Sequence, residues 1–281
     1  MKKNEILITG GTGKTGRRVM ERLQRSGEYQ IRIGSRSQTP PFDWNEPGSW
    51  VAALKGVDTV YITFQPDLAI PSAPSIIQSF TSLASSHGVR KMVLLSGRGE
   101  AEAQRCEDIV KATASSWTII RASWFNQNFS EGFFLNDILA GRIVLPRVAS
   151  PEPFVDADDI ADVVVKCLLD DKHNTKTYEL TGPELLTFEQ AIHHVASASA
   201  NRLEYEEMPM DAYEEMMRSY HVPEDQLWLI RYLFTEVLDG RNASITNDVE
   251  LVLGRKARSF SQFAAESASL GIWSAASLRK A

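Results

Sequence analysis

The sequence predicts an α/β fold in which helices cover a doubly wound parallel sheet and a smaller, mainly helical C-terminal lobe follows. Through the first half of the chain, strand-like and helix-like segments alternate, which is typical of such a sheet. A glycine-rich loop separates the first strand-like segment from the first helix-like one. From about Gly182 onward, the alternation gives way to helix-rich sequence. The 281 residues suffice for one large domain or two moderate ones.

The expected strands are short, rich in Ile, Val, Leu and Tyr, and bounded by Gly, Ser or Asp. They span Glu5–Thr9, Gln30–Ser35, Thr59–Thr63, Lys91–Ser96 and Trp117–Arg121, with helices between them at Thr15–Arg25, Ser49–Leu54, Ala73–Ser86 and Ala101–Ala114. Residues 39–48 contain three prolines and a glycine, so we expect a loop there and a short or degraded strand. Further on, Asp158–Leu169 predicts a helix with an acidic first turn, and Thr177–Leu180 another strand.

Two domains follow from this pattern. We expect residues 1–155 to form the sheet domain, to which residues 156–181 return. Residues 182–281 should form the smaller helical lobe, which parts of residues 124–147 join.

Composition excludes several classes of protein. A net charge of −6, without a run of Lys and Arg, argues against a nucleic-acid partner. The apolar segment after the charged start is too short for a signal peptide, and no apolar stretch approaches the ~20 residues that span a bilayer. Cys106 and Cys167 fall in helix-like segments and are expected to be buried free thiols. We therefore expect a cytoplasmic monomer or homodimer that binds a small molecule and has no membrane partner.

The stretch ITGGTGKTGRR, residues 8–18, predicts a dinucleotide-binding loop. A strand followed by glycines at positions 10, 13 and 16 and then a helix is the context of a Rossmann-type fingerprint. One glycine permits the tight turn, one lets the backbone approach the pyrophosphate, and one lets helix and strand pack closely. The GxxxxGK[ST] spacing of a mononucleotide loop is absent. The expected contacts to the phosphates are Gly10, Thr12, Gly13, Lys14, Thr15 and Gly16.

The end of the second strand predicts which dinucleotide is bound. An acidic residue about 20 positions past the last glycine would hold the ribose hydroxyls of NAD. That position holds Arg36, beside Ser35 and Ser37, and a guanidinium suits the 2′-phosphate of NADP. The alternative is that Arg36 is only a solvent-exposed charge at a strand end. We expect NADP(H) to be preferred over NAD(H).

Several motifs together resemble the NmrA-like, atypical branch of the short-chain dehydrogenase/reductase superfamily, over nearly the whole chain. Within this branch the chain looks closest to the group of the ergot-alkaloid (festuclavine and agroclavine) dehydrogenases. The resemblance implies NADP(H) binding, a Rossmann core and a small C-terminal lobe that closes a substrate cleft. The motifs are ITGGTGKTGRR, IGSRS (33–37), VRKMVLLSG (89–97), WTIIRASWFNQNFSE (117–131), PFVDADDIADV (153–163), YELTGPELLTFEQA (178–191) and LGRKARSFSQFA (253–264). The chain departs from the family at Ala122, where a proline commonly follows the strand arginine.

The proton-donating pair of the wider superfamily, a Tyr followed four residues later by Lys, is missing. None of the seven tyrosines has Lys at that position. In the corresponding region, Glu107 and Lys111 stand one helical turn apart, and we expect an ordinary surface ion pair. An iminium electrophile would accept hydride without a proton, which agrees with the reactions of the ergot-type enzymes. Two alternatives stay open: a non-catalytic NADP-sensing regulator of NmrA type, or carbonyl or quinone reduction with another donor.

Residues that follow the strands are the candidates for the nicotinamide and substrate site, because ligands bind at the carboxyl ends of such strands. Ser96 could bond the substrate or the cofactor, or merely end a strand; Arg98 could orient an anionic group, or be an exposed loop residue. Phe64, Trp124 and Phe125 could stack a flat substrate, or be core residues at the sheet edge. The expected contacts are Thr63, Phe64, Ser96 and Gly97 for the cofactor, Phe64, Trp124, Phe125 and Asn126 for the substrate, and Ser96, Arg98 and Trp124 for catalysis.

Two further expectations concern acidic residues and metals. Asp156 is expected near the cleft, whereas Asp158 and Asp159 are better explained as partners of a helix N-terminus. No HExxH, CxxC or GxSxG motif occurs, and the adjacent His193 and His194 make a poor metal pair, so no metal is expected.

Overall fold

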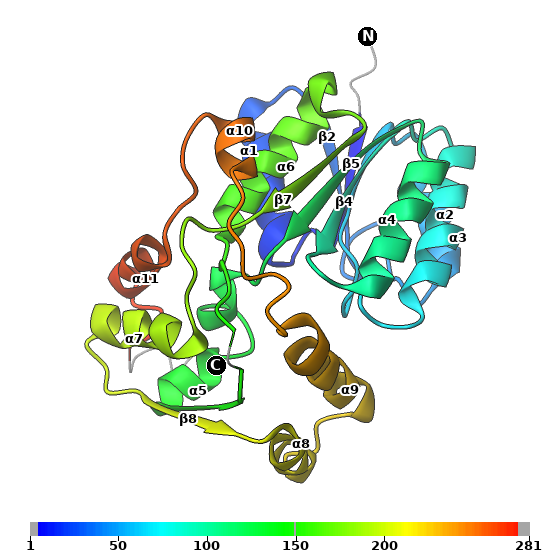
Figure 1. Cartoon of the computed structure of the whole chain (residues 1–281). Coiled ribbons are helices and arrows are strands. Elements are labelled where there is room, and N and C mark those ends of the chain that lie inside the picture. Colours follow the sequence, from blue (N-terminus) through cyan, green and yellow to red (C-terminus); the bar gives the residue numbers. More distant parts are fainter. Residues whose placement is uncertain (1–4, 149, 275–281) are drawn as a thin grey trace. The chain divides into compact units, whose positions relative to one another are not determined.

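A computed structural model describes residues 5–148 and 150–274. It divides into two compact units, each built from separate stretches of the chain (Figure 1). The first unit comprises residues 1–122, 157–180 and 248–255, and the second comprises residues 123–156, 181–247 and 256–281. This division assigns residues 123–156 to the second unit, in which the sequence analysis expects parts of residues 124–147. Residues 1–4, 149 and 275–281 of the two expected domains lie outside the described part.

The first unit is built on a six-stranded parallel sheet with the order β2-β1-β3-β4-β5-β7 (Figure 1). Sequence order reverses between β1 and β3, so the loop after β1 lies at the switch point where such sheets bind ligands. The strands are β1 (Glu5–Thr9), β2 (Gln30–Gly34), β3 (Thr59–Ile62), β4 (Lys91–Gly97), β5 (Ser116–Ala122) and β7 (Lys176–Leu180).

Helices cover both faces of this sheet. On one face α1 packs against α6 and α6 against α10, and on the other α4 packs against α3 and α3 against α2 (Figure 1). The helices are α1 (Lys14–Ser26), α2 (Trp50–Leu54), α3 (Ala73–Ser86), α4 (Ala101–Thr113), α6 (Ala157–Leu169) and α10 (Asp248–Leu253). The predicted α/β fold class, a Rossmann-type parallel sheet with a helical C-terminal part, is confirmed.

The loop that follows β2 replaces a strand with an aromatic cluster. Phe42 and Trp44 are buried against Phe80 of α3, with ring centroids 5.7 and 4.9 Å from it. The Trp44 indole N–H donates to the backbone carbonyl of Thr63 at 3.0 Å. Burial of each ring contributes roughly 1.5–3 kcal/mol, which holds this proline-rich segment against the sheet without strand pairing.

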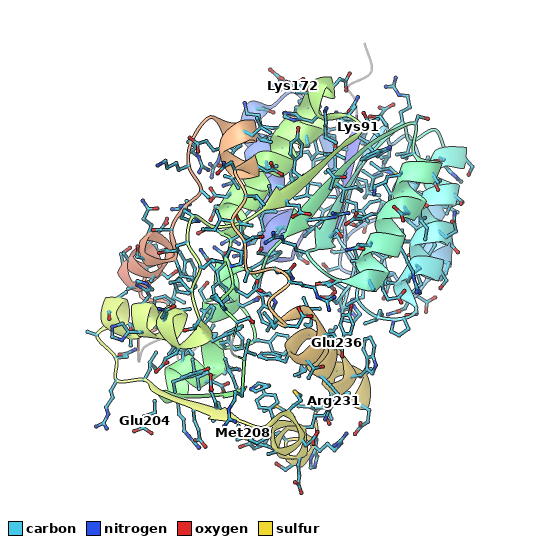
Figure 2. All side chains as sticks on the ribbon, viewed as in Figure 1. Lys91, Lys172, Glu204, Met208, Arg231 and Glu236 are labelled. Carbon is cyan, nitrogen blue, oxygen red and sulfur yellow. The ribbon has the colours of Figure 1, made fainter. Side chains whose placement is uncertain are left out.

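The second unit has an aromatic core and a small parallel sheet of β6 (Arg142–Pro146) and β8 (Glu204–Met208). Phe129, Phe154 and Phe260 are fully buried in that core. Figure 2 labels Glu204 and Met208, the two ends of β8. The helices are α5 (Leu135–Ala140), α7 (Phe188–Ser199), α8 (Met210–Ser219), α9 (Glu224–Tyr232) and α11 (Phe260–Ser269), with a π-helical turn at Leu233–Val237.

The sequence did not predict β6 and β8. The β8 segment, EYEEM, is acidic and lacks alternation of buried and exposed apolar residues. Its pairing to β6 joins residues that are 62 positions apart in the chain, as Arg142 lies opposite Glu204 and Pro146 opposite Met208. Among the described residues, no helix is long and apolar enough to cross a membrane.

Candidate cofactor site

Close packing explains two of the three glycines of the predicted fingerprint, Gly10 and Gly16. A Cβ atom on Gly16 would lie 2.3 Å from the Gly10 carbonyl oxygen and 2.8 Å from the Gly11 Cα atom. Gly10 has a φ of +60°, and a Cβ atom there would lie 2.2 Å from the Thr63 hydroxyl oxygen. The loop therefore lies directly against helix α1 and the end of β3, as a phosphate-binding turn requires.

Helix α1 begins at this loop without a side-chain cap. Gly13 is the N-cap residue, has extended backbone angles and provides no side-chain acceptor for the first turn. Backbone N–H groups at an uncapped N-terminus can donate to an anion, and the helix dipole favours negative charge there. The Thr15 hydroxyl accepts a hydrogen bond from Tyr61 at 3.1 Å, and its own O–H group can still donate. Thr12 is exposed in the loop.

At the end of β2, Arg36 is exposed to solvent. Its neighbours Ser35 and Ser37 share a hydrogen bond of 3.1 Å between their hydroxyls. In residues 5–148 and 150–274, no carboxylate forms an ion pair with Arg36. A guanidinium that is not neutralised, beside two hydroxyls, fits a phosphate monoester.

The cofactor candidates that follow β3 have mainly structural contacts. The Thr63 hydroxyl donates to the Thr9 carbonyl at 2.7 Å, which ties the ends of β1 and β3 together. Phe64 belongs to the hydrophobic core and packs on Trp44, with ring centroids 5.1 Å apart. The ring of Phe64 is therefore covered by the protein on the side of Trp44.

A buried ionic network lies at the carboxyl ends of β4, β5 and β7. Glu107 of α4 accepts hydrogen bonds from Ser96 at 2.8 Å and from Arg121 at 2.6 Å. Arg121 also contacts Glu179 at 3.1 Å, and Glu179 pairs with Arg98 at 3.1 Å. Hydrogen bonding to Glu107 raises the pKa of Arg121, against the opposite effect of burial.

This network corrects two of the expectations. Glu107 is 0% exposed, so it is a buried partner of Ser96 and Arg121 and not a surface residue, although Lys111 does lie 3.6 Å from it. Arg98 is only 8% exposed and is held by Glu179, so it is not an exposed loop residue. The register of the strands brings these side chains together, because Ser96 lies opposite Arg121, and Arg121 opposite Glu179.

The sequence analysis missed a pair of neighbouring carboxyl groups, Glu100 and Asp67. Glu100 follows β4 and is hydrogen-bonded to Asp67, which follows β3. Glu100 is 8% exposed, and a Cβ atom on Gly97 would lie 2.0 Å from its Oε1 atom. Burial, together with the charge of Asp67, raises the pKa of Glu100 well above its usual value.

Comparison with known proteins agrees with this geometry. A family model described as NAD(P)H-binding matches residues 10–171. The chain belongs to the NAD(P)H-binding family.

Several known proteins resemble the chain over almost its whole length. An uncharacterized oxidoreductase of Bacillus subtilis is 31% identical over 94% of this chain and 96% of its own. Prestalk A differentiation protein A of Dictyostelium discoideum is 28% identical over 94% of this chain and 92% of its own. Agroclavine dehydrogenase of Claviceps fusiformis is 26% identical over 93% and 96%, so the predicted resemblance to NmrA-like and ergot-alkaloid dehydrogenases is confirmed.

Solved structures share the fold. An NADPH-dependent quinone oxidoreductase of Escherichia coli, complexed with NADPH, superposes with a TM-score of 0.77 at 15% identity, over 93% of this chain and 99% of that one. The Citrobacter triphenylmethane reductase with NADP(H) has a TM-score of 0.73 at 17% identity, over 94% and 99%. These two structures share the fold of this chain, and the family match shows that the chain is an NAD(P)H-binding protein.

In the second unit, the expected substrate residues follow β5. The half-buried Trp124 ring packs edge-on against Phe188 and Phe234, with centroids 5.4 and 5.5 Å away. Phe125 is also half-buried, and Asn126 is fully buried with its backbone N–H bonded to Val155 at 2.9 Å. Neither polar atom of the Asn126 amide has a hydrogen-bond partner among the described residues.

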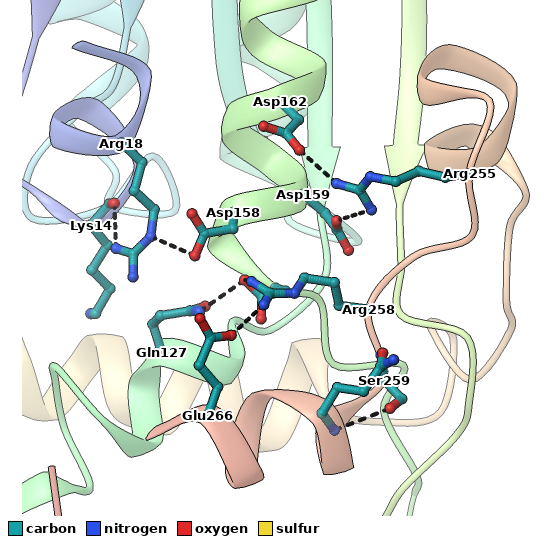
Figure 3. A network of polar contacts seen from close by, with 12 residues as sticks. Lys14, Arg18, Gln127, Asp158, Asp159, Asp162, Arg255, Arg258, Ser259 and Glu266 are labelled. Atoms are coloured by element: carbon teal, nitrogen blue, oxygen red, sulfur yellow. Dashed lines mark hydrogen bonds and ion pairs between the residues drawn. The ribbon is translucent and has the colours of Figure 1, made fainter. Parts of the chain in front are cut away.

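The acidic residues near position 158 bind arginines (Figure 3). In the first unit Asp158 contacts Arg18 at 3.1 Å, and Asp159 contacts Arg255 at 2.7 Å. In the second unit, the Asp156 carboxylate accepts a hydrogen bond from the Gln127 side chain at 3.0 Å. The aspartates of α6 therefore form ion pairs with other elements, beyond the expected interaction with their own helix N-terminus. Within the described ranges, no group of three or more His, Cys, Asp or Glu residues could hold a metal ion.

Proposed function

We propose that the protein is an NADP(H)-dependent reductase that transfers hydride to a small cyclic or aromatic electrophile. The observation that carries the proposal is the loop after β1, where close packing demands glycine and an uncapped helix begins. Loop and helix would hold the pyrophosphate through backbone N–H groups. When bound, the cofactor would supply the hydride, and this chain's residues would orient the two reactants and exclude water.

The preference for NADP(H) rests on Arg36. An acidic residue at this position would hold the ribose hydroxyls of NAD and repel a phosphate. Here an exposed guanidinium stands beside Ser35 and Ser37, and no carboxylate in the described part neutralises it. A planar fork of donors of this kind matches a dianionic 2′-phosphate.

Two observations support a flat, conjugated substrate. Related proteins are named for such electrophiles: an azoreductase of Xenophilus azovorans, the quinone oxidoreductase and the triphenylmethane reductase. In the second unit, Trp124 and Phe125 are only half-buried, so part of each ring is open to contact with a planar molecule. The side-chain amide of Asn126, the next residue, has no partner among the described residues and could bond a polar substituent of the substrate.

In the first unit, Ser96 and Gly97 remain proposed contacts to the cofactor.

The test is incubation of the purified protein with NADPH or NADH and a panel of iminium ions, enones, quinones and azo or triphenylmethane dyes. We expect loss of nicotinamide absorbance with at least one class, faster with NADPH, and a reduced product by mass spectrometry. Tight NADPH binding without turnover across the panel would overturn the proposal and favour an NADP-sensing regulator.

A further inference from the structure

We infer that the carboxyl pair of Glu100 and Asp67 is the proton donor of this reductase and takes the place of the missing Tyr–Lys pair. The inference rests on the proposed function and extends it to neutral electrophiles, such as carbonyls and quinones, which need a proton as well as a hydride. Both residues belong to the first unit, so the inference depends on contacts within one compact body.

The position of the pair is the first support. Asp67 follows β3 and Glu100 follows β4, and these strands are parallel neighbours, so both carboxyls lie at the carboxyl edge of the sheet. This is the edge at which open α/β sheets bind ligands. The phosphate loop lies at the same edge, because a Cβ on Gly10 would touch Thr63, the residue that follows β3.

A buried carboxyl oxygen is the second support. Glu100 Oε2 is buried and, among the residues that the structure describes, accepts no hydrogen bond from an N–H or O–H donor. Two carboxyl groups in hydrogen-bond contact need a proton between them, because two adjacent carboxylates would repel. A buried oxygen of this kind normally has a partner, and a substrate oxygen would supply one.

Charge around the pair keeps the proton in place. The charged groups that act on Glu100 are Asp67 and Glu107, and both raise its pKa in addition to the effect of burial. Glu107 itself forms ion pairs with Arg121 and Lys111, which offset part of its negative charge. Asp67 is half-buried and accepts a hydrogen bond from the Ala69 backbone at 2.9 Å, which helps to fix its carboxyl group.

Three other hydroxyl groups in the described part of the first unit already have partners. The Ser96 hydroxyl donates to Glu107, and the fully buried Tyr61 hydroxyl donates to Thr15. Tyr178 is hydrogen-bonded to His173 at 2.8 Å, and His173 precedes β7 at the opposite edge of the sheet. The carboxyl pair is therefore a better candidate for the proton donor than these three hydroxyl groups.

The step balances as follows for a carbonyl. Hydride from the reduced nicotinamide adds to the carbonyl carbon, the π electrons move to oxygen, and oxygen takes the proton of the carboxyl pair. The nicotinamide is oxidised, the carbonyl is reduced to an alcohol, and the pair is left doubly ionised. A proton from water, through Asp67, restores it.

The first experiment measures the proton without turnover. In the cofactor-free protein, infrared or carbon-13 NMR titration of carboxyl groups should find a protonated carboxyl at pH 7 that is absent from Glu100→Gln. Glutamine keeps the shape and can donate to Asp67. The control is Asp108→Asn, which changes an exposed acid of α4, the helix that begins directly after Glu100. This variant should leave the signal of the protonated carboxyl unchanged. Two ionised carboxylates at neutral pH would overturn the inference.

The second experiment separates proton transfer from hydride transfer. General acids typically contribute about 10²–10⁴-fold, so Glu100→Gln should slow reduction of a neutral benzoquinone by roughly that factor. Reduction of malachite green, a triphenylmethane cation that needs no proton, should change by less than about twofold, because hydride addition alone neutralises it. Asp67→Asn should show the same split. Equal effects on the two probes, large or small, would contradict a donor role.

The two experiments also separate this inference from the proposed function. If the wild-type protein reduced neither probe, the reductase assignment and the donor role would both be wrong, whereas the titration would still report the protonation of the pair. If it reduced both probes and Glu100→Gln did so equally well, only the donor role would be wrong.

Discussion

The carboxyl group of Glu100 lies over Gly97, in the space that the Cβ atom of any other residue would occupy. All three carboxyl atoms would come within 2.0–2.2 Å of such a Cβ. The end of β4 therefore needs glycine because a buried acid three residues later has taken its side-chain volume.

Gly97→Ala should force Glu100 out of its position. Overpacking of this kind costs about 1–3 kcal/mol in free energy of unfolding, measured by urea denaturation. Gly48→Ala is the matched control, because its Cβ would meet nothing within 4 Å, and it should change stability by less than about 0.5 kcal/mol. Glu100→Ala combined with Gly97→Ala should recover part of the loss. A double variant as unstable as the sum of the singles would show that the two residues do not compete for space.

Arg36→Glu should weaken NADPH binding far more than NADH binding. Loss of charge-assisted hydrogen bonds to the 2′-phosphate corresponds to about 1.5–3 kcal/mol, or roughly 10- to 150-fold in Kd, measured by calorimetry. Arg25→Glu makes the same charge change at an exposed position near the end of α1 and should leave the ratio of the two affinities unaltered. An equal loss for both cofactors would show that Arg36 does not contact the phosphate.

Arg121→Met should be strongly destabilising, because it leaves the fully buried Glu107 without its strongest partner. Removing one partner of a buried ion pair costs about 3–5 kcal/mol. The control is Arg105→Met on α4, the helix that carries Glu107. The ion pair of Arg105 with Glu102 lies at the surface and contributes about 0–1 kcal/mol. Adding Glu107→Gln to Arg121→Met should restore stability. No restoration would mean that Arg121 acts through packing and not through its charge.

Stability should depend on pH with opposite signs at two acids. The pKa of Glu100 is raised by burial and Asp67, so the folded state holds a proton that the unfolded state releases, and stability falls as pH rises above about 4.3. Glu100→Gln should remove this loss.

Asp158 supplies the comparison. Although burial acts to raise it, Arg22 and Arg18 hold the pKa of Asp158 below its usual value. The stability from these pairs is present above about pH 3.9 and is lost as pH falls through the folded pKa. Asp158→Asn should therefore destabilise at neutral pH and flatten the acid limb. Unfolding curves from pH 3 to 9 measure both effects, and identical profiles for the two variants would contradict the assignment.

Local patterns predicted most of the first unit. The expected strand Glu5–Thr9 and helix Ala73–Ser86 have the observed bounds, since apolar runs, turn residues and glycine spacing act over a few residues. The same holds for the glycine loop, whose geometry is set by its own backbone. By contrast, β8 lacks any local strand pattern and pairs only because β6 lies beside it.

The sequence by itself determined the parallel sheet, the glycine-rich loop and the guanidinium at position 36, because each depends on neighbours along the chain. Only the tertiary structure decided that Glu107 is buried under Arg121 and that Glu100 meets Asp67, which stands 33 residues earlier. Burial and charge pairing depend on which strands end side by side, and a helix pattern such as EDIVK does not reveal whether its acid faces water or a neighbouring strand.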